Sequence, residues 1–428
     1  MGAYKFSLKM LKVNFKQSLL YLFAIIFPIA IIVNLINMIN NQTFFVNGGG
    51  NNANDAAVVV FFLAILVCIF SFYANAYFIK SKSKEMAIEE LNGMTSGTLA
   101  KTLLFQNAVV EIIGGAIGII LGILFMPLFL KLMYSVMGLK GSIWILSPTA
   151  VGGTIAILFL QIGYVSMGDY SYASTREIID LMNINKKVRS RDVRSLKFDS
   201  RIYIILYLLP ILSIFICKEP TDVATMGIFN VVFTIFGVRG ILNFYIPEEI
   251  LKLKKEKYSE DKIKLIALSN VYESIKKVKF IITTLIITTE VILCIASAFG
   301  DKPQIKTVCV ISYVTSMIMI ASSLVYKTIL DIDSRRHTFA QLRIIGYTSK
   351  QLKNIVNEEF KIFYTINVGI SLVPILIFAY LFVKNNIISM EISIFMLCIL
   401  FIVFFITAVV SYIMYTKLIF EKKAYRIL

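Results

Sequence analysis

The chain has 428 residues, of which 58% are hydrophobic and only 16% are charged. Soluble domains carry about 25% charged residues, so this composition excludes an ordinary soluble protein and predicts an integral membrane protein. The net charge of +17 comes from Lys and Arg residues in loops between apolar runs, which favours membrane orientation over nucleic-acid binding. One histidine and five singly placed cysteines argue against a metal site or a disulfide framework.

Ten apolar runs have roughly the length that a bilayer-crossing helix needs, which is ~20 residues. They are 18–39, 56–79, 104–133, 148–170, 202–217, 222–246, 280–300, 306–328, 360–383 and 392–416. The fifth run is short and ends at Cys217-Lys-Glu-Pro220; if it and the sixth were one broken span, all later spans would invert. Lys and Arg concentrate in every second loop, and only ten spans with both termini in the cytoplasm satisfy this pattern. We therefore expect an all-α, ten-span protein with an uncleaved N-terminal anchor.

Two stretches of the chain are alike. LNGMTSGTL (Leu91–Leu99) and IIGYTSKQL (Ile344–Leu352) share Gly-x-Thr-Ser-x-x-Leu, centred on Gly93 and Gly346. Both fall in loops predicted to be cytoplasmic, each after a span that runs inward. The chain is therefore predicted to hold two parallel three-helix repeats, roughly 56–172 and 306–417, related by an axis along the membrane normal.

Each repeat loop is predicted to be a short helix, a glycine break and a second helix. The short helices are Ser83–Leu91 and Thr338–Ile345, and the glycines suit left-handed C-caps. A Thr or Ser just after each glycine, Thr95 or Ser96 and Thr348 or Ser349, would cap the second helix. Apolar faces of the short helices would lie against the membrane face or a partner. The alternative is a pair of capped turns without a partner.

The segment Lys80–Met133, with KSKSKEMAIEELNGMTSGTLAK and VVEIIGGAIGIILGILF, resembles an FtsX-like permease domain of ABC transporters. DSRRHTFAQLRIIGYTSKQLKNIVNEEF, the amphipathic KIKLIALSNVYESIKKVK and the opening FSLKMLKVNFKQSLLYLF resemble parts of the bacitracin-type (BceB-type) antimicrobial-peptide permeases. Those permeases have a large extracellular domain between spans seven and eight. Here that connection is only 301–306, which is too short to bind a peptide outside the cell.

The resemblance implies four regions: 1–55 with the first span, a first FtsX-like unit at 56–172, central spans at 173–305, and a second unit with the tail at 306–428. It implies a non-catalytic permease subunit in the cytoplasmic membrane of a Gram-positive bacterium. It also implies three kinds of partner: two copies of a cytoplasmic ATPase, membrane lipids, and a sensor histidine kinase. ATP and Mg would be held by the ATPase. The expected ATPase-coupling residues are Glu85, Met86, Ile88, Glu89, Leu91, Gly93, Thr95, Phe339, Leu342, Arg343, Ile345, Gly346 and Thr348. The chain has no phosphate-binding loop of its own.

Other residues stand out inside the spans. Gly114, Gly118 and Gly122 are spaced four apart, as small residues are where two helix backbones approach closely. Arg239 and Glu290 lie deep in spans six and seven, where they could form an ion pair, line a substrate path, or leave Arg239 to extend to the interface. Glu111 is expected to reach the interface or a lysine.

Function is narrowed to a few classes. An ABC permease that confers antimicrobial-peptide resistance is the first expectation, and export of a small peptide is the second. A non-transporting membrane regulator stays open. A secondary transporter is less favoured because the predicted repeats are parallel. In addition, Glu290 is the only strong acid near the middle of the predicted spans, whereas such a transporter needs a polar site there.

Overall fold

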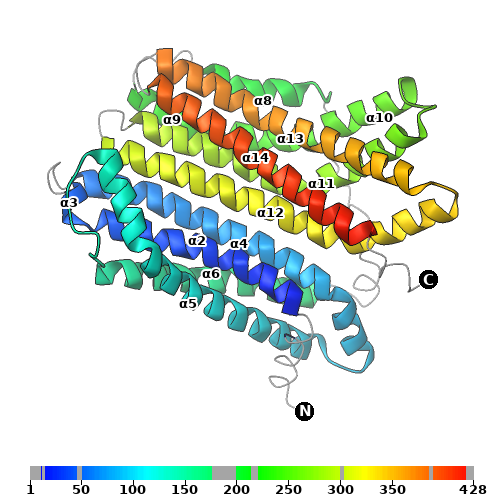
Figure 1. The fold of residues 1–428 in the computed structure, drawn as a ribbon, viewed down its shortest axis with the longest axis horizontal. Coiled ribbons are helices and arrows are strands. Elements are labelled where there is room, and N and C mark those ends of the chain that lie inside the picture. The colour runs from blue at the N-terminus through cyan, green and yellow to red at the C-terminus, as the bar shows by residue number, and fades with distance from the viewer. Residues whose placement is uncertain are drawn as a thin grey trace. The chain divides into compact units, whose positions relative to one another are not determined.

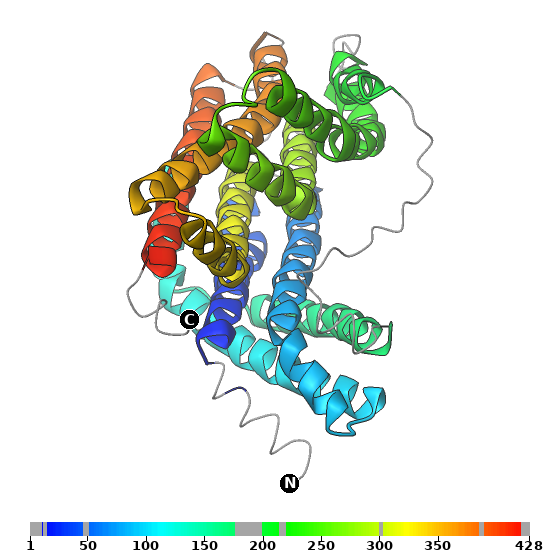
Figure 2. The same cartoon turned by 90° about the vertical axis from the view of Figure 1, so that its right-hand side faces the viewer.

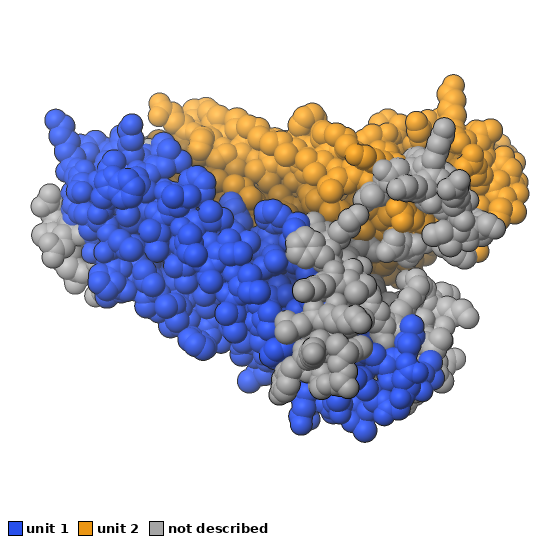
Figure 3. All heavy atoms as spheres, turned by 60° about the horizontal axis from the view of Figure 1, so that its bottom comes forward, with its two compact units in different colours: residues 1–195, 302–308 blue, residues 196–301, 309–428 orange. Residues whose placement is uncertain are grey.

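The computed structural model describes residues 11, 15–45, 51–175, 199–213, 220–298, 303–384 and 389–420, and the regular structure of these residues is helical. Contacts divide the chain into two compact units, coloured separately in Figure 3. The first unit is Met1–Ser195 with Lys302–Val308, and the second is Leu196–Asp301 with Cys309–Leu428. Each unit has its own interior and is described by itself.

The first unit contains α2 (Phe15–Ile39), α3 (Gln42–Phe45), α4 (Asn51–Leu91), α5 (Ser96–Met137) and α6 (Pro148–Thr175), labelled in Figure 1. Helix α2 supplies much of the interior, because Tyr21, Ile25, Ile29 and Ile32 are all buried. The longest helices continue well beyond the ~20 residues that a bilayer needs. Helix α4 continues beyond its apolar segment, which ends at Ala76, as far as Leu91, where the turn to α5 begins.

The glycines of α5 lie against α2. A methyl group built on Gly118 would lie 3.0 Å from the carbonyl oxygen of Ile26, and one built on Gly122 would lie 2.8 Å from that of Ala30. A methyl group on Gly114 would meet the side chain of Ile25 at 3.1 Å. Side chains at these three positions would therefore push the two backbones apart, and the stripe of small residues permits the close contact.

The second unit contains α8 (Ile202–Ser213), α9 (Pro220–Gly240), the π-helical turn η2 (Ile241–Tyr245), α10 (Ile246–Glu256), α11 (Lys262–Ala298), α13 (Ser349–Lys384) and α14 (Met390–Phe420). It also contains α12 (Pro303–Ile344) from Cys309 onward. Helix α11 joins the predicted amphipathic segment, 262–279, to the predicted seventh span without a break. Side chains at the start of α11 are therefore rigidly connected to those deep in the span.

Nine helices in the described ranges are long and apolar enough to cross a membrane, and they correspond to predicted spans one to four and six to ten. The fifth predicted span corresponds to α8, which has 12 residues, and its predicted end, 214–217, lies outside the described residues. The chain is a multi-pass membrane protein. The count of ten spans and their orientation remain predictions.

The short cytoplasmic helices predicted at Ser83–Leu91 and Thr338–Ile345 are wrong as separate elements. Helix α4 runs unbroken from Asn51 to Leu91, and α12 runs unbroken from Pro303 to Ile344. Neither 77–91 nor 329–344 contains a glycine or proline, so nothing in those segments interrupts the helix. Each span and the segment after it therefore form one stiff rod.

Candidate functional site

Two helical hairpins contain the repeated sequence motif. The first hairpin comprises residues 79–106, the end of α4 and the start of α5, and the second comprises residues 332–359, the end of α12 and the start of α13. The turn that closes each hairpin can be followed in Figure 2. The outgoing helices extend beyond their apolar segments, which end at Ala76 in α4 and at Ile329 in α12.

The first hairpin turns through a left-handed glycine. Gly93 has φ of 89°, a conformation that L side chains rarely adopt. The N–H of Met94 donates to the carbonyl of Glu89 at 3.1 Å, and the N–H of Gly93 donates to that of Glu90 at 3.0 Å. This pair of bonds is a Schellman motif, which satisfies carbonyls that the end of a helix leaves free.

The second hairpin repeats these bonds around its own glycine. Gly346 has φ of 107°. The N–H of Tyr347 donates to the carbonyl of Leu342 at 3.1 Å, and the N–H of Gly346 donates to that of Arg343 at 3.0 Å. The shared sequence pattern therefore produces the same local backbone twice. We call two residues of the hairpins equivalent when they align with Gly93 placed on Gly346.

A threonine caps the returning helix in each hairpin. The hydroxyl of Thr95 accepts the N–H of Thr98 at 3.4 Å, and the hydroxyl of Thr348 accepts the N–H of Gln351 at 3.3 Å. In the second hairpin the Gln351 side chain also accepts the N–H of Thr348 at 2.9 Å, which completes a capping box. Both returning helices thus begin at a fixed residue.

Equivalent apolar side chains hold each hairpin together. The first cluster contains Ile79, Met86, Leu99 and Leu103, with small residues from α4, α5 and α6 around them. The second contains the equivalent residues, which are Ile332, Phe339, Leu352 and Val356, together with Ala267, Ile355, Tyr415 and Ile419. The same positions therefore pack the outgoing helix against the returning helix in both units.

The structure corrects the expected docking face. Met86 and Phe339 are only 5% and 4% exposed, because they pack inside the hairpins and cannot face a partner. The apolar side chains that remain outside are Ile88, Leu91, Ile344 and Ile345, which are exposed by 58%, 61%, 76% and 73%. Ile344 was missed by the sequence reasoning. We call these four residues the hairpin tips.

The other residues expected to couple to an ATPase lie around the tips. Gly93, Thr95, Arg343, Gly346 and Thr348 are exposed. Glu89 and Leu342 are half-buried, and the side chain of Glu85 lies outside the described part of the structure. The predicted coupling residues therefore divide into an exposed group at each turn and an interior group that shapes it.

A polar pair joins the two helices of each hairpin. In the first hairpin the ammonium of Lys82 donates to the side-chain carbonyl of Gln106. In the second, the equivalent residues are Arg335 and Glu359, which form an ion pair with a separation of 3.6 Å. All four side chains are 5% exposed or less. We call these contacts the cross-hairpin pairs.

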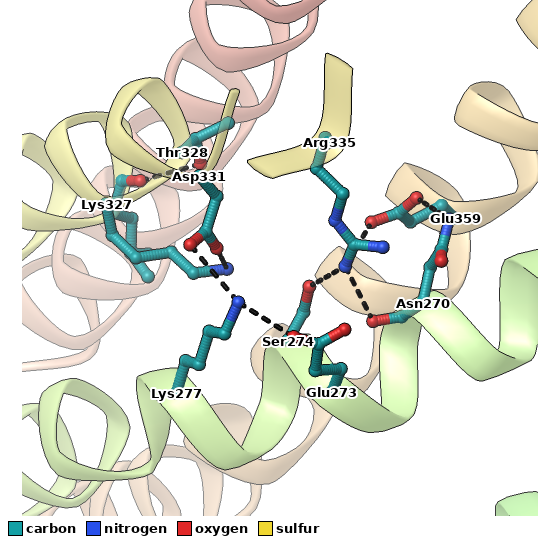
Figure 4. A network of polar contacts seen from close by, with 10 residues as sticks. Asn270, Glu273, Ser274, Lys277, Lys327, Thr328, Asp331, Arg335 and Glu359 are labelled. Atoms are coloured by element: carbon teal, nitrogen blue, oxygen red, sulfur yellow. Dashed lines mark hydrogen bonds and ion pairs between the residues drawn. The ribbon is translucent and has the colours of Figure 1, made fainter. Parts of the chain in front are cut away.

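The second cross-hairpin pair is part of a larger network, shown in Figure 4. The guanidinium of Arg335 also donates to the backbone carbonyl of Asn270 and to the hydroxyl of Ser274, both at 3.2 Å. The amide of Asn270 donates to Glu359 at 2.8 Å. Because Asn270 and Ser274 belong to α11, these bonds tie that helix to the second hairpin.

Lysines complete the network one turn away. Lys277 lies 3.0 Å from Glu273 and 3.3 Å from Asp331, and Lys327 lies 3.1 Å from Asp331. Burial by itself raises the pKa of the Asp331 carboxyl, but Lys327 and Lys277 outweigh burial and lower that pKa to about 2. The sequence reasoning did not find this network, although Lys327, Asp331 and Arg335 follow one another at the four-residue spacing of a helix face.

Of the three alternatives for Arg239 and Glu290, the ion pair is not formed. Arg239 is exposed, whereas Glu290 is 2% exposed and neither of its carboxylate oxygens has a hydrogen-bond partner. Loop lengths placed both residues at a similar depth, but depth does not decide which face of a helix a side chain occupies. Glu111 also departs from its expectation, because it is 1% exposed and accepts the hydroxyl of Tyr21 at 2.7 Å.

A family model described as FtsX-like permease C-terminal matches residues 56–171, which include the first hairpin and helices α4 to α6. This part of the first unit is therefore similar to an FtsX-like permease domain. The unit predicted at 56–172 stays a prediction. The predicted second unit stays an interpretation, and the contacts that recur at equivalent residues are its support.

The chain is also similar to curated bacterial permeases. It is 24% identical over 231 residues to the bacitracin export permease BceB of Halalkalibacterium halodurans. The matched region is 54% of this chain and 35% of that protein. The identity to BceB of Bacillus subtilis is 24% over 197 residues, 45% of this chain and 30% of that protein. An uncharacterized ABC transporter permease of Bacillus subtilis, YvcS, is 32% identical over 136 residues, 31% of this chain and 21% of that protein. The matched region thus spans 35% or less of each relative.

Proposed function

We propose that this chain is the permease subunit of an ABC transporter and that two ATPase copies dock on its two hairpins. The observation that carries the proposal is the pair of equivalent turns, each with a left-handed glycine, a threonine cap and exposed apolar tip residues. Exposed apolar side chains at a fixed turn suit a protein partner better than water. Two equivalent turns suit a partner that is itself present twice.

Each hairpin can transmit a force along its two helices. Helix α4 has 41 residues and α12 has 42, so each is roughly 60 Å long at 1.5 Å per residue. The cross-hairpin pair and the apolar cluster fasten the returning helix to each of them. Force applied at a tip therefore moves both helices of that hairpin together, and these helices continue into the membrane.

The proposed substrate is a peptide or a lipid-like molecule at the membrane, with antimicrobial-peptide resistance as the role and export of a small peptide as the second choice. Two relatives are named bacitracin export permeases, which supports a peptide-related role. The short connection between α11 and α12 leaves no room for an external peptide-binding domain there. Recognition would then occur at the spans themselves.

Copurification tests the proposal. The tagged full-length chain is purified in mild detergent from its native bacterium, and the bound proteins are identified by mass spectrometry. We expect an ATPase subunit with a phosphate-binding loop at two copies per chain, and stimulation of its ATP hydrolysis by the chain. Recovery of the intact chain without a nucleotide-binding partner overturns the proposal.

A further inference from the structure

Four helices of the first unit bring a set of buried polar side chains together inside the membrane-spanning segments. The set, which we call the polar core, contains Tyr21 of α2, Ser71 and Asn75 of α4, Asn107 and Glu111 of α5, and Gln161 and Asp169 of α6. Each is 2% exposed or less. Polar and ionisable groups are costly at such positions and tend to mark function.

One half of the polar core is fully bonded. The amide of Asn75 donates to one carboxylate oxygen of Asp169 at 2.5 Å, and the amide of Asn107 donates to the other at 2.6 Å. The Asn107 amide also donates to the side-chain oxygen of Asn75 at 2.7 Å. These bonds fix the orientation of both amides, and the side-chain oxygen of Asn107 therefore points away from Asp169.

The other half has acceptors without donors. The second carboxylate oxygen of Glu111 and the side-chain oxygens of Asn107 and Gln161 are all buried and have no hydrogen-bond partner. Glu111 and Asn107 lie one turn apart on α5. Gln161 donates to the hydroxyl of Ser71 at 2.9 Å, and that hydroxyl is itself a hydrogen-bonding neighbour of the Glu111 carboxyl, so Gln161 lies near Glu111. A buried oxygen left unpaired costs free energy, so three such oxygens within one polar core indicate a missing positive or donating group.

The charges lead to the same conclusion. Among the described side chains around the polar core, the carboxyls of Glu111 and Asp169 are accompanied by one ammonium, that of Lys82, which faces Asp169. The other titratable groups that face Glu111 are Tyr21 and Cys68, and neither brings a positive charge. The core therefore lacks one positive charge when both carboxyls are ionised.

We propose that the polar core binds one monovalent cation, either Na⁺ or a proton, at the free oxygens of Glu111, Asn107 and Gln161. Oxygen atoms of carboxylates and amides are the ligands that hard cations prefer. A proton on the free oxygen of Glu111 would instead create a donor for the neighbouring amide oxygens. Either occupant supplies the one charge that the core lacks.

The site lies directly beside the first hairpin. Asn75, Asn107 and Asp169 are each four residues, or one helical turn, from Ile79, Leu103 and Ala173 of the hairpin's apolar cluster. Any motion that separates α4, α5 and α6 at the hairpin also separates the cation ligands. Cation occupancy therefore stabilises the packed arrangement of the first hairpin, which is a property beyond the proposed transport function and independent of an ATPase.

The test measures thermal unfolding of the purified full-length chain in detergent, in NaCl or in choline chloride at the same ionic strength. A ligand that binds the folded state raises the Tm with its concentration. If Na⁺ occupies the site, Tm rises by a few degrees in NaCl relative to choline chloride. If a proton occupies it, the two salts give the same Tm, and Tm falls as the pH rises because the folded state holds the extra proton.

The variant E111Q removes the charge and should abolish a dependence on Na⁺, or weaken a dependence on pH to the part that the other buried carboxyls contribute. The matched control is E290Q, which removes an equally buried carboxyl from the second unit and should keep the dependence. If E111Q does not fold, infrared spectra of E290Q provide the test instead. This variant retains Glu111, so its protonated-carboxyl band should still change with Na⁺ or pH. A wild-type Tm without either dependence, a dependence in E111Q as large as in the wild type, or an unchanging band overturns the proposal.

Discussion

Arg335 lies 3.6 Å from Glu359, and this buried ion pair joins the outgoing and returning helices of the second hairpin. The first hairpin has Lys82 and Gln106 at the equivalent positions, also in contact. A cation on the outgoing helix and an oxygen acceptor on the returning helix are thus common to both hairpins. The acceptor is charged only in the second hairpin, where the pair also bonds to α11.

Removing one member of the second pair should be far more harmful than removing both. R335M or E359M alone leaves a buried charge without its partner, which costs about 3–5 kcal/mol. The double variant R335M/E359M should lose much less, because neither charge remains. Equilibrium unfolding of the four proteins in mixed micelles gives the coupling free energy.

An exposed pair on the same helix is the control for that cycle. Lys361 and Glu358 lie 3.4 Å apart, with side chains 73% and 30% exposed. K361M should change the free energy of unfolding by about 0.5 kcal/mol or less. Equal losses in R335M and K361M would contradict the interior role of the Arg335–Glu359 pair.

Asp331 should make the protein sensitive to acid. Its folded-state pKa of about 2 lies below the value of about 3.9 in an unfolded chain. The carboxylate therefore contributes stability above about pH 4, and that contribution is lost as the pH falls from about 4 towards 2. The loss should be about 2–3 kcal/mol in the wild type and absent in D331N. The measurement is the Tm of both proteins across this pH range. An equal slope of Tm against pH in the wild type and D331N would contradict the prediction.

The sequence predicts local features of this protein well. Nine of the ten predicted spans correspond to long apolar helices in the described residues, because a bilayer requires such helices. Gly93 and Gly346 stood out because the end of a helix favours a left-handed glycine. The unbroken course of α4 was also readable from the absence of glycine and proline, but the polar residues after the span suggested a separate helix.

Contacts between distant residues were not predictable from one sequence. Tyr21 and Glu111 are 90 residues apart, and Asn75 and Asp169 are 94 residues apart. Helix periodicity tells which residues share a face but not which helix that face meets. Asp169 was overlooked for this reason, and whether Arg239 and Glu290 form an ion pair could not be decided from the sequence.

The close contact between α2 and α5 gives a test of packing. An alanine at position 122 would place its methyl group 2.8 Å from the carbonyl oxygen of Ala30, so G122A should lower the Tm. G152A on α6 is the matched control, because nothing lies within 4 Å of a methyl group there. It should be neutral or stabilising by up to about 1 kcal/mol, the helix preference for alanine over glycine. The prediction fails if both variants shift the Tm equally.

Substitutions at the turns should separate folding from ATPase association. In G346P, the proline has no N–H to donate to the carbonyl of Arg343, and proline cannot adopt φ of 107°. The turn and its exposed side chains should therefore be displaced. G93P does the same in the first hairpin. Both variants should insert into the membrane in wild-type amounts and recover less ATPase on copurification.

The hairpin tips allow the sharpest version of that test. Ile344 and Ile345 are 76% and 73% exposed, so I344D/I345D should leave the free energy of unfolding within about 1 kcal/mol of the wild type. The same variant places two charges where the ATPase would contact apolar side chains, and it should reduce ATPase recovery at least tenfold. F401D on α14 is the control, because Phe401 is 50% exposed within a predicted span and should impair insertion rather than ATPase binding. Wild-type ATPase recovery by I344D/I345D would show that the tip of the second hairpin is not the docking surface, since the turn itself remains intact in this variant.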